Sequence, residues 1–442
     1  MFAGQPEGRH QHKATIVYQT LFHIPQRIAG VPVFGFGLLL ALWAVLSMVW
    51  LFWLIRRQGL SGETLSYLPV ILALGAIIAW VLPVLCDHQG LPIRGYGLMI
   101  LLAVLSAVGL TIHRGKQLGI SPETVVNLAF WLFVPGIIGA RVFYVVEYWS
   151  EQYSPALRRG VLPLLAELVN ISQGGLVVYG ALMGVVVGMV LFVRRYRMNL
   201  LATCDLVAPG LVLALAIGRI GCLLNGCCFG AISHAPWAVS FPLGSPPYES
   251  QVLRRQSEGL VRLRLDDPNS GSALRWVWYS ASEDSAAAGA GLRDGDRLKR
   301  IGQLNLLGPE ATPESVYRLL AAARRSGEVL QVEVEPNRTL HVPAEALPLR
   351  SKPVHPTQLY STIDAAILCL LLLAYAPYQR RHGELFALML SVYGVSRFLI
   401  EILRTDEPKK FIFGTTIAQV ISVAVLLCAA GLWAYIITSR RR

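Results

Sequence analysis

The sequence predicts an all-α polytopic membrane protein of about nine transmembrane helices, with a small α+β insert in an extracytoplasmic loop. Composition is the first reason: 54% of the 442 residues are hydrophobic and only 15% are charged, whereas soluble domains average about a quarter charged. The second is that apolar residues gather in runs of about 20, the length of an α-helix that crosses a bilayer. The third is that one polar stretch, 249–350, separates the sixth run from the seventh.

The apolar runs give the predicted transmembrane helices in chain order. Each is about as long as a helix needs to be to cross a hydrocarbon layer of about 30 Å. The runs cover 33–55, 68–86, 92–112, 123–148, 175–193, 203–224, 363–378, 383–403 and 413–438.

Lysine and arginine residues set the predicted orientation, because both are enriched in cytoplasmic loops. They fall in every second connection, at Arg56/Arg57, Arg114/Lys116, Arg194/Arg195/Arg197, Arg380/Arg381 and Arg440/Arg441/Arg442. This alternation predicts an N-terminus outside, a cytoplasmic C-terminus and an external connection at 225–362. Topology therefore accounts for the net charge of +12, and no nucleic-acid partner is predicted.

The polar stretch between the sixth and seventh runs carries the signals of a folded insert. Residues 313–325 follow Thr312 as an N-cap and predict an amphipathic helix, and 330–334 alternate as a β-strand does. Residues 286–303 read AAAGAGLRDGDRLKRIGQ and resemble the start of a PDZ-type domain, which is expected over about 272–347. PDZ domains bind extended peptides by strand addition. The alternative is a small structural insert without a ligand.

Charged side chains inside predicted membrane helices are candidates for function, because each costs about 2.5–3.5 kcal/mol on insertion scales. The predicted orientation places four of them in the outer half of the bilayer, together with two tyrosines at helix starts. The six residues are Arg141, Arg219, Arg397, Glu401, Tyr96 and Tyr179. Polar groups from five predicted helices therefore collect at one depth.

Four polar residues form a stripe along the predicted helix 383–403 and at its end. Tyr393, Arg397, Glu401 and Arg404 are spaced by four, four and three residues, which places them on one helix face. Planar, permanently charged guanidinium groups suit a phosphate, and a lipid phosphate is the anion available at headgroup depth. The alternative is an ion-pair network inside the membrane, such as Arg397 with Glu401.

Ordered motifs point to a family. Residues 218–230 read GRIGCLLNGCCFG. Five further blocks are 93–99 (IRGYGLM), 139–141 (GAR), 174–180 (GGLVVYG), 355–360 (HPTQLY) and 393–397 (YGVSR). In these motifs the chain resembles the prolipoprotein diacylglyceryl transferases, over about 92–248 and 352–438. The resemblance implies that family's seven-helix core, in the bacterial cytoplasmic (inner) membrane.

The resemblance also implies a division of the chain. Residues 1–90 are then an N-terminal extension with two spans, and 249–350 are the extracytoplasmic insert. The transferase core is split into 91–248 and 351–442.

The activity that the resemblance implies is transfer of the diacylglyceryl group of phosphatidylglycerol to the lipobox cysteine of a prolipoprotein. The products are a thioether and glycerol phosphate, and no cofactor or metal is expected. By motif position, Arg219 would bind the phosphate and Arg397 would be the second essential arginine. The other implied catalytic residues are Tyr393, Glu401 and Tyr179, and the other implied substrate-binding residues are Tyr96, Asn225, Gly230, Arg141 and Arg404.

The chain departs from the family pattern near the expected chemistry. Tyr179 stands where the family has a histidine often proposed as the base, and Ser361 replaces an acidic residue after HPTQLY. A base must generate the thiolate, which is the nucleophile. The candidates are Tyr179 as a tyrosinate, Glu401 and the substrate phosphate, and the sequence leaves the three open.

Three cysteines also replace or adjoin signature residues: Cys222, Cys227 and Cys228. Without a CxxC spacing or a partnering histidine they give a weak zinc signal. A structural role is the main interpretation, and a disulfide or a metal site is the alternative.

Two other classes of function compete with the transferase. A non-catalytic membrane receptor or scaffold would bind exported peptides through the PDZ-like insert. An intramembrane protease would need a motif such as HExxH, which the sequence lacks.

Overall fold

The computed structural model describes residues 20–28, 30–59, 67–86, 90–169, 177–267, 271–280, 282, 285–308, 310–405 and 414–438. Arg440, Arg441 and Arg442, and the start of the 174–180 block, lie outside the described residues. The chain forms two compact units. One holds Ile100–Leu223, Cys228–Ala238 and Pro353–Arg442, and the other holds Met1–Met99, Leu224–Cys227 and Val239–Lys352.

Eight helices of the described residues are long and apolar enough to cross a membrane, so the chain is a multi-pass membrane protein. The helices are α1 (Leu38–Gln58), α5 (Gly95–Gln117), α6 (Pro122–Glu147), α9 (Val178–Tyr196), α10 (Leu200–Asn225), α14 (Thr357–Tyr375), α15 (Glu384–Leu403) and α16 (Ile417–Thr438). The short predicted run 363–378 is longer in the structure, because α14 begins directly after Pro356 and a 3₁₀ turn, η4 (Ala376–Tyr378), extends it.

The predicted ninth span at 68–86 forms a helical stretch that is shorter than the other eight. That run forms α3 (Leu68–Ala76), a π-helical turn η1 (Ile77–Val81) and α4 (Leu82–Val84), and its apolar helix is shorter than the eight spans. The predicted span included Leu85 and Cys86, but the helix ends at Val84, before both residues. A crossing takes about 17–25 helical residues, so the stretch 68–84 lies at the short end of that range.

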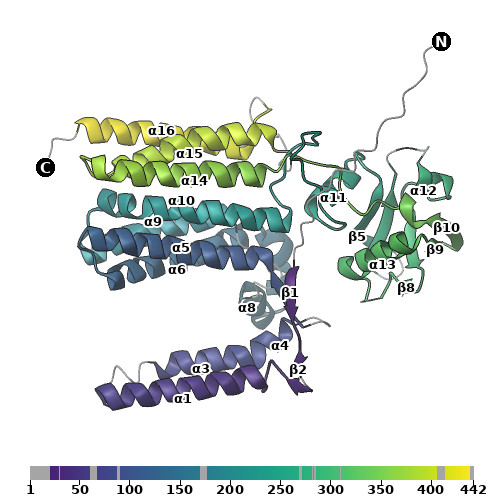
Figure 1. The fold of residues 1–442 in the computed structure, drawn as a ribbon, viewed down its shortest axis with the longest axis horizontal. Helices are drawn as coiled ribbons and strands as arrows, with labels where there is room; N and C mark the ends of the chain where they lie inside the picture. Colours follow the sequence, from purple (N-terminus) through teal and green to yellow (C-terminus); the bar gives the residue numbers. More distant parts are fainter. Residues whose placement is uncertain are drawn as a thin grey trace, which may run out of the picture. The chain divides into compact units, whose positions relative to one another are not determined.

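In the first unit, long helices lie side by side as a bundle; Figure 1 shows α6, α9, α10, α14, α15 and α16 in this arrangement. Helices α10, α14 and α15 share a core of buried small and aliphatic residues: Ala208, Val212, Ala216, Ala365, Leu368, Cys369, Leu372 and Leu385. Tyr393 of the polar stripe packs against this core. The stripe therefore lies on a helix whose position is set by two neighbours.

Glycines bring α6 and α9 into backbone contact. A Cβ atom added at Gly180, Gly184 or Gly188 would collide with backbone carbonyl oxygens of α6, including those of Gly139 and Pro135. Small residues at this spacing let membrane helices approach closely.

A buried carboxylate fixes the start of α15. Asp205 accepts hydrogen bonds from the backbone N–H of Gly383 and, at 2.9 Å, from that of Phe386. Arg114 donates to the Asp205 carbonyl oxygen at 2.7 Å. The first amide groups of a helix lack partners within the helix, so Asp205 supplies acceptors that anchor α15 to α10.

The second unit contains a six-stranded antiparallel sheet with strand order β10-β9-β7-β6-β5, in which β8 pairs with β7. The strands are β5 (Gly259–Asp267), β6 (Gly271–Tyr279), β7 (Arg297–Ile301), β8 (Leu304–Asn305), β9 (Val329–Val334) and β10 (Arg338–Pro343). The helices of this region are α11 (Pro246–Leu253), α12 (Ala286–Gly289), α13 (Pro313–Ser326) and the 3₁₀ turn η3 (Ala344–Ala346).

The predicted helix and strand of the insert are confirmed. Thr312 caps α13 by accepting from the N–H of Ser315 at 3.2 Å, and β9 alternates exposed and buried residues. The sheet begins at Gly259 rather than near 272, because β5 pairs with β6 along its whole length. Tyr248 of α11 also belongs to the core of the insert and accepts from the N–H of Leu260 at 2.9 Å.

Short strands lie beside the N-terminal helices of the second unit. Strand β1 (Thr20–Ile24) pairs antiparallel with β4 (Leu91–Arg94), and β2 (Arg27–Ile28) pairs with β3 (Val31–Pro32). The start of α1 at Leu38 therefore follows a β-turn region that the hydropathy pattern had included in the first span.

Candidate functional site

Glu401 is a buried carboxylate near the end of α15, with a side chain that is 0% exposed. Its Oε2 atom accepts from Arg397 at 2.5 Å and from Arg404 at 3.1 Å. Its Oε1 atom accepts from the hydroxyl of Thr416 at 3.1 Å. The helical spacing of the stripe lets both arginines reach one carboxylate, so the predicted stripe is a connected cluster.

Thr416 was not predicted from the sequence, and it links this cluster to α16. The N–H of Gln419 donates to the Thr416 hydroxyl at 3.3 Å, and the N–H of Thr416 donates to the Gln419 side chain at 3.1 Å. This reciprocal pattern is a capping box. A Thr-x-x-Gln sequence before an apolar run is its signal, so the cap was detectable, whereas its bond to Glu401 was not.

Arg219 lies in the last two turns of α10 and interacts electrostatically with Tyr393 and Arg404. The structure therefore brings three predicted site residues from two helices together. Arg219 also interacts with the thiols of Cys222 and Cys228, whose sulfur atoms lie within 4.8 Å of each other. All seven cysteines are present as thiols rather than disulfides.

Gly230 lies on a small platform of extended segments that joins the ends of these helices. It forms an isolated β-bridge with Arg404, and the N–H of Ala231 donates to the Leu403 carbonyl at 3.0 Å. On its other side, the N–H of Gly230 donates to the His355 carbonyl at 3.0 Å. The motif 218–230 is thus attached to both the stripe and the HPTQLY block.

Arg141 makes a different set of contacts. Its guanidinium donates to the carbonyl oxygens of Leu168 at 3.0 Å and Glu167 at 2.6 Å, in the last turn of α8 (Val161–Val169). It also lies over the rings of Tyr144 and Tyr153, the latter in the π-helical turn η2 (Trp149–Tyr153), which α7 (Ser154–Arg159) follows. These contacts place Arg141 at a helix C-terminus, where a cation is stabilised.

The remaining predicted residues lie at helix ends. Tyr179 is in the first turn of α9 and is 40% exposed. In the second unit, Tyr96 is in the first turn of α5 and is 42% exposed. Asn225 is the last residue of α10, and Gly95 of α5 is packed so closely on Leu224 that an added Cβ would lie 2.8 Å from it.

The structure reveals a second carboxylate within the span α14. Asp364 accepts a hydrogen bond from the hydroxyl of Ser396 at 2.7 Å, and Ser396 precedes Arg397 in α15. The carboxylate therefore lies at the depth of the arginine cluster. The sequence analysis missed Asp364, although an acidic residue inside an apolar run was the available signal.

A hydrogen-bonded trio occupies the start of α14. The Nδ1 atom of His355 lies 3.1 Å from the hydroxyl of Tyr360, and the indole N–H of Trp237 donates to the same hydroxyl at 2.7 Å. His355 and Tyr360 belong to the HPTQLY block, which the sequence analysis used only as a family motif.

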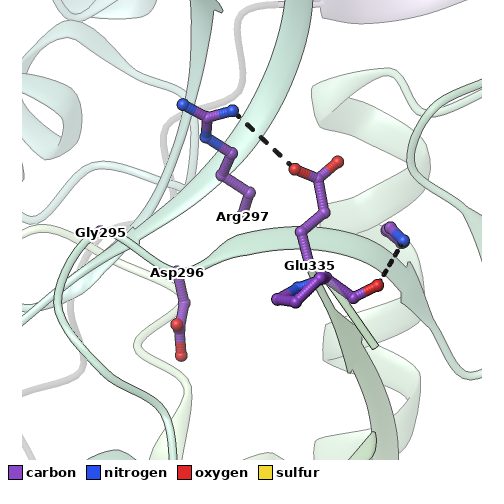
Figure 2. Close-up of a pocket in the computed structure, with 6 residues that line it drawn as sticks. Gly295, Asp296, Arg297 and Glu335 are labelled. Atoms are coloured by element: carbon purple, nitrogen blue, oxygen red, sulfur yellow. Dashed lines mark hydrogen bonds and ion pairs between the residues drawn. The ribbon is translucent and has the colours of Figure 1, made fainter. Parts of the chain in front are cut away.

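A shallow hollow on the insert is charged but balanced. Figure 2 shows Arg297 paired with Glu335 across it, at 3.9 Å, and Asp296 on its wall. Asp296 is in turn paired with Arg338. Because these charges neutralise one another, the hollow is a poor site for an anion.

Comparison with known proteins agrees with the motif order. The family model described as prolipoprotein diacylglyceryl transferase matches residues 83–435. A phosphatidylglycerol–prolipoprotein diacylglyceryl transferase of Rhodopirellula baltica is 31% identical over 95% of this chain and 89% of its own length. A second such protein, from Clostridium perfringens, is 35% identical over 38% of this chain and 65% of its own length. One from Trichormus variabilis is 34% identical over 37% of this chain and 55% of its own length.

The polytopic fold with its polar cluster defines a membrane enzyme class, and the comparisons define which one. The chain belongs to the prolipoprotein diacylglyceryl transferase family and is a transferase. Because the alignment with the Rhodopirellula protein covers 95% of this chain, it also takes in most of the insert and the N-terminal helices. The sequence analysis had placed both outside the resemblance.

Proposed function

We propose that this protein transfers the diacylglyceryl group of phosphatidylglycerol to the lipobox cysteine of prolipoproteins. One observation carries the proposal at the level of the site. Two arginines, Arg397 and Arg404, bond a single buried carboxylate, Glu401, and a third, Arg219, interacts electrostatically with Arg404. Even if Asp364 is counted with Glu401, positive charge is in excess among the described residues, and a bound anion would balance it.

The excess of positive charge favours a phosphate site over a simple ion-pair network as the role of the stripe. The ion pair between Arg397 and Glu401 exists, as the simpler alternative expected. Among the described residues, however, the carboxylate of Glu401 is outnumbered by the guanidinium groups of Arg219, Arg397 and Arg404, which supports the phosphate role. A lipid phosphodiester supplies the missing negative charge, and guanidinium groups can bind it through paired hydrogen bonds.

In the proposed reaction the arginines act on the leaving group. The thiolate of the lipobox cysteine attacks the glycerol carbon of phosphatidylglycerol, a carbon–sulfur bond forms, and the carbon–oxygen bond to phosphate breaks. Negative charge then gathers on the departing glycerol phosphate. Preorganised donors aimed at developing charge are usually the largest contribution to catalysis, and Arg219, Arg397 and Arg404 are those donors.

Glu401 acts as the group that positions the arginines rather than as the base. Both of its oxygen atoms already accept hydrogen bonds, and its side chain is 0% exposed. A general base has to come within hydrogen-bond reach of the proton that it removes. Tyr393 completes the site as a neighbour of Arg219, and Gly230 completes it as the backbone partner of Arg404.

Tyr96, Asn225 and Arg141 keep the substrate-binding roles that their motif positions imply, whereas Tyr179, whose motif position implies a catalytic role, is proposed to contact the substrate instead. Tyr96 and Tyr179 are partly exposed at helix starts, where they can contact a lipid headgroup.

The proposed setting is the bacterial inner membrane, with the N-terminus outside and the C-terminus in the cytoplasm. The arginine pattern of the loops supports this orientation. The insert would then face the compartment in which prolipoproteins arrive. Its alternating strand and capped helix support a PDZ-like module that recruits exported peptides, and no nucleic acid takes part. The competing proposal is a non-catalytic receptor that uses the insert alone.

A reconstituted transfer assay tests the function. Purified protein in phosphatidylglycerol vesicles is mixed with a lipobox peptide, and the mass of the peptide is followed. Wild-type protein should add one diacylglyceryl group to the cysteine, and vesicles of phosphatidylcholine alone should give none. An unmodified peptide, under conditions in which a known transferase works, would favour the receptor.

A substitution of Arg219 tests whether this residue binds the phosphate. Arg219→Ala should lower the transfer rate about 10²–10³-fold, the usual cost of removing one donor to developing charge. Arg194→Ala is the matched control, because Arg194 is a charged residue at the far end of α9, in its last turn, and should transfer at the wild-type rate. Undiminished transfer by Arg219→Ala would refute the phosphate role while leaving the transferase activity standing.

A further inference from the structure

His355 is held rigidly beside the arginine cluster by its backbone. Its N–H donates to the Ala231 carbonyl at 2.9 Å, and its own carbonyl accepts from the N–H of Gly230 at 3.0 Å. Two residues later, the Thr357 hydroxyl donates to the Cys228 carbonyl at 2.5 Å. The histidine is therefore part of the platform that also carries Arg404.

The closeness of this packing explains why residue 230 is glycine. A Cβ atom there would lie 2.7 Å from the Cβ atom of His355 and 2.9 Å from Cγ2 of Thr357. Those distances are too short for unbonded carbon atoms, so any larger residue would push His355 away. Since Gly230 also pairs with Arg404, the glycine holds His355 next to the segment that binds the proposed phosphate.

The imidazole ring is oriented by a second pair of side chains. Its Nδ1 atom is hydrogen-bonded to the Tyr360 hydroxyl, and Trp237 fixes that hydroxyl from the other side. Among the described residues, no hydrogen bond to the Nε2 atom is present. A base whose ring is fixed by a third group, with one nitrogen left for the substrate, is the arrangement found in activated-nucleophile sites.

We propose that His355 is the general base that takes the proton from the lipobox thiol. The proposal rests on the proposed transfer reaction. The Nε2 atom accepts the thiol proton as the sulfur forms its bond to the glycerol carbon, and the carbon–oxygen bond breaks to release glycerol phosphate. The proton then passes from the imidazolium to the departing phosphate or to water. Tyr360 and Trp237 are positioning residues.

The other candidate bases are placed less well. Glu401 is fully engaged with Arg397, Arg404 and Thr416. Asp364 accepts from Ser396 inside the helix bundle. Imidazole is also the side chain whose unperturbed proton affinity suits transfer near neutral pH, whereas an unperturbed phenol holds its proton to well above that range.

A lipobox peptide with selenocysteine in place of cysteine distinguishes a general base from a residue that has only a structural role. A selenol ionises at lower pH than a thiol and needs no base at neutral pH. His355→Asn should lose about 10²–10⁴-fold in transfer to the cysteine peptide, the usual contribution of a general base. The same variant should modify the selenocysteine peptide at nearly the wild-type rate. Tyr360→Phe should show the same pattern with a smaller loss.

Each outcome has one meaning. Equal losses on both peptides, or wild-type transfer to the cysteine peptide, would overturn the role of His355. Should His355→Asn fail to fold, His355→Gln and Tyr360→Phe are judged by the same ratio of the two rates. His382→Asn, at an exposed histidine before α15, is the matched control and should match wild type on both peptides. A wild-type protein that modifies neither peptide would refute the transfer reaction itself.

Discussion

Two carboxylates of this protein each face two arginines, and the two sites differ in every other respect. Glu335, on the insert, lies 3.8 Å from Arg275 and 3.9 Å from Arg297, with 26% of its side chain exposed. Glu401, in α15, bonds Arg397 and Arg404 at 2.5 and 3.1 Å with none of its side chain exposed. The sequence contains the same residue types at both places.

The difference teaches that burial, and not the presence of ion pairs, distinguishes the proposed functional cluster from an ordinary surface pair. Exposed pairs contribute between zero and about 1 kcal/mol, because water screens them and their side chains lose freedom. Water does not reach the buried carboxylate of Glu401, so water can neither screen its two ion pairs nor take its place as the partner of the two guanidinium groups. Its arginines are therefore held in one geometry, as a catalytic anion site requires.

The largest expected effect comes from neutralising each carboxylate in turn. Glu401→Gln leaves Arg397 and Arg404 without their counter-charge, which should destabilise the protein by about 3–5 kcal/mol and lower transfer at least about 10²-fold through misplaced arginines. Glu335→Gln should change stability by no more than about 1 kcal/mol and leave transfer unchanged. Thermal unfolding in detergent and the transfer assay measure both, and similar losses in the two variants would contradict the comparison.

Alanine substitutions of two glycines test the same contrast between the arginine cluster and the insert, and we expect an effect of intermediate size. Gly230→Ala should displace His355 and Thr357, cost about 1–3 kcal/mol as overpacking does, and reduce transfer strongly. Gly289→Ala, in α12 of the insert, meets nothing within 4 Å and should be neutral in both measurements. Wild-type transfer by Gly230→Ala would show that the platform tolerates movement of His355.

The smallest effect is expected from two threonines that cap helices. Thr416→Val and Thr312→Val each remove a capping hydroxyl, at a cost of about 1 kcal/mol. Only Thr416→Val should also slow transfer, because its hydroxyl bonds Glu401. Thr416→Ser should restore the rate, since serine keeps that donor. A normal rate in Thr416→Val would limit the residue to its capping role.

Much of the architecture was predictable because it follows from local physics. Apolar runs of sufficient length indicated the eight spans, and Thr312 indicated the start of α13. The run 68–86 was predicted slightly too long, because hydropathy does not reveal where a helix ends. Thr416 and Trp237 were not identified as site residues, because their partners Glu401 and Tyr360 lie 15 and 123 residues away. Asp364 was overlooked although it lies in an apolar run, and His355 and Tyr360 were used only as parts of a family motif.

The sequence by itself determined the membrane class, the transferase family and the identity of Arg219, Arg397 and Glu401 as candidates, since charge inside an apolar run is costly wherever it occurs. Only the tertiary structure decided what those residues do to one another. It bonded both oxygen atoms of Glu401 to neighbouring side chains, and it placed His355 against Gly230. The reason is that hydrogen bonds and close packing between α10, α14, α15 and α16 depend on how the helices meet, which no single segment encodes.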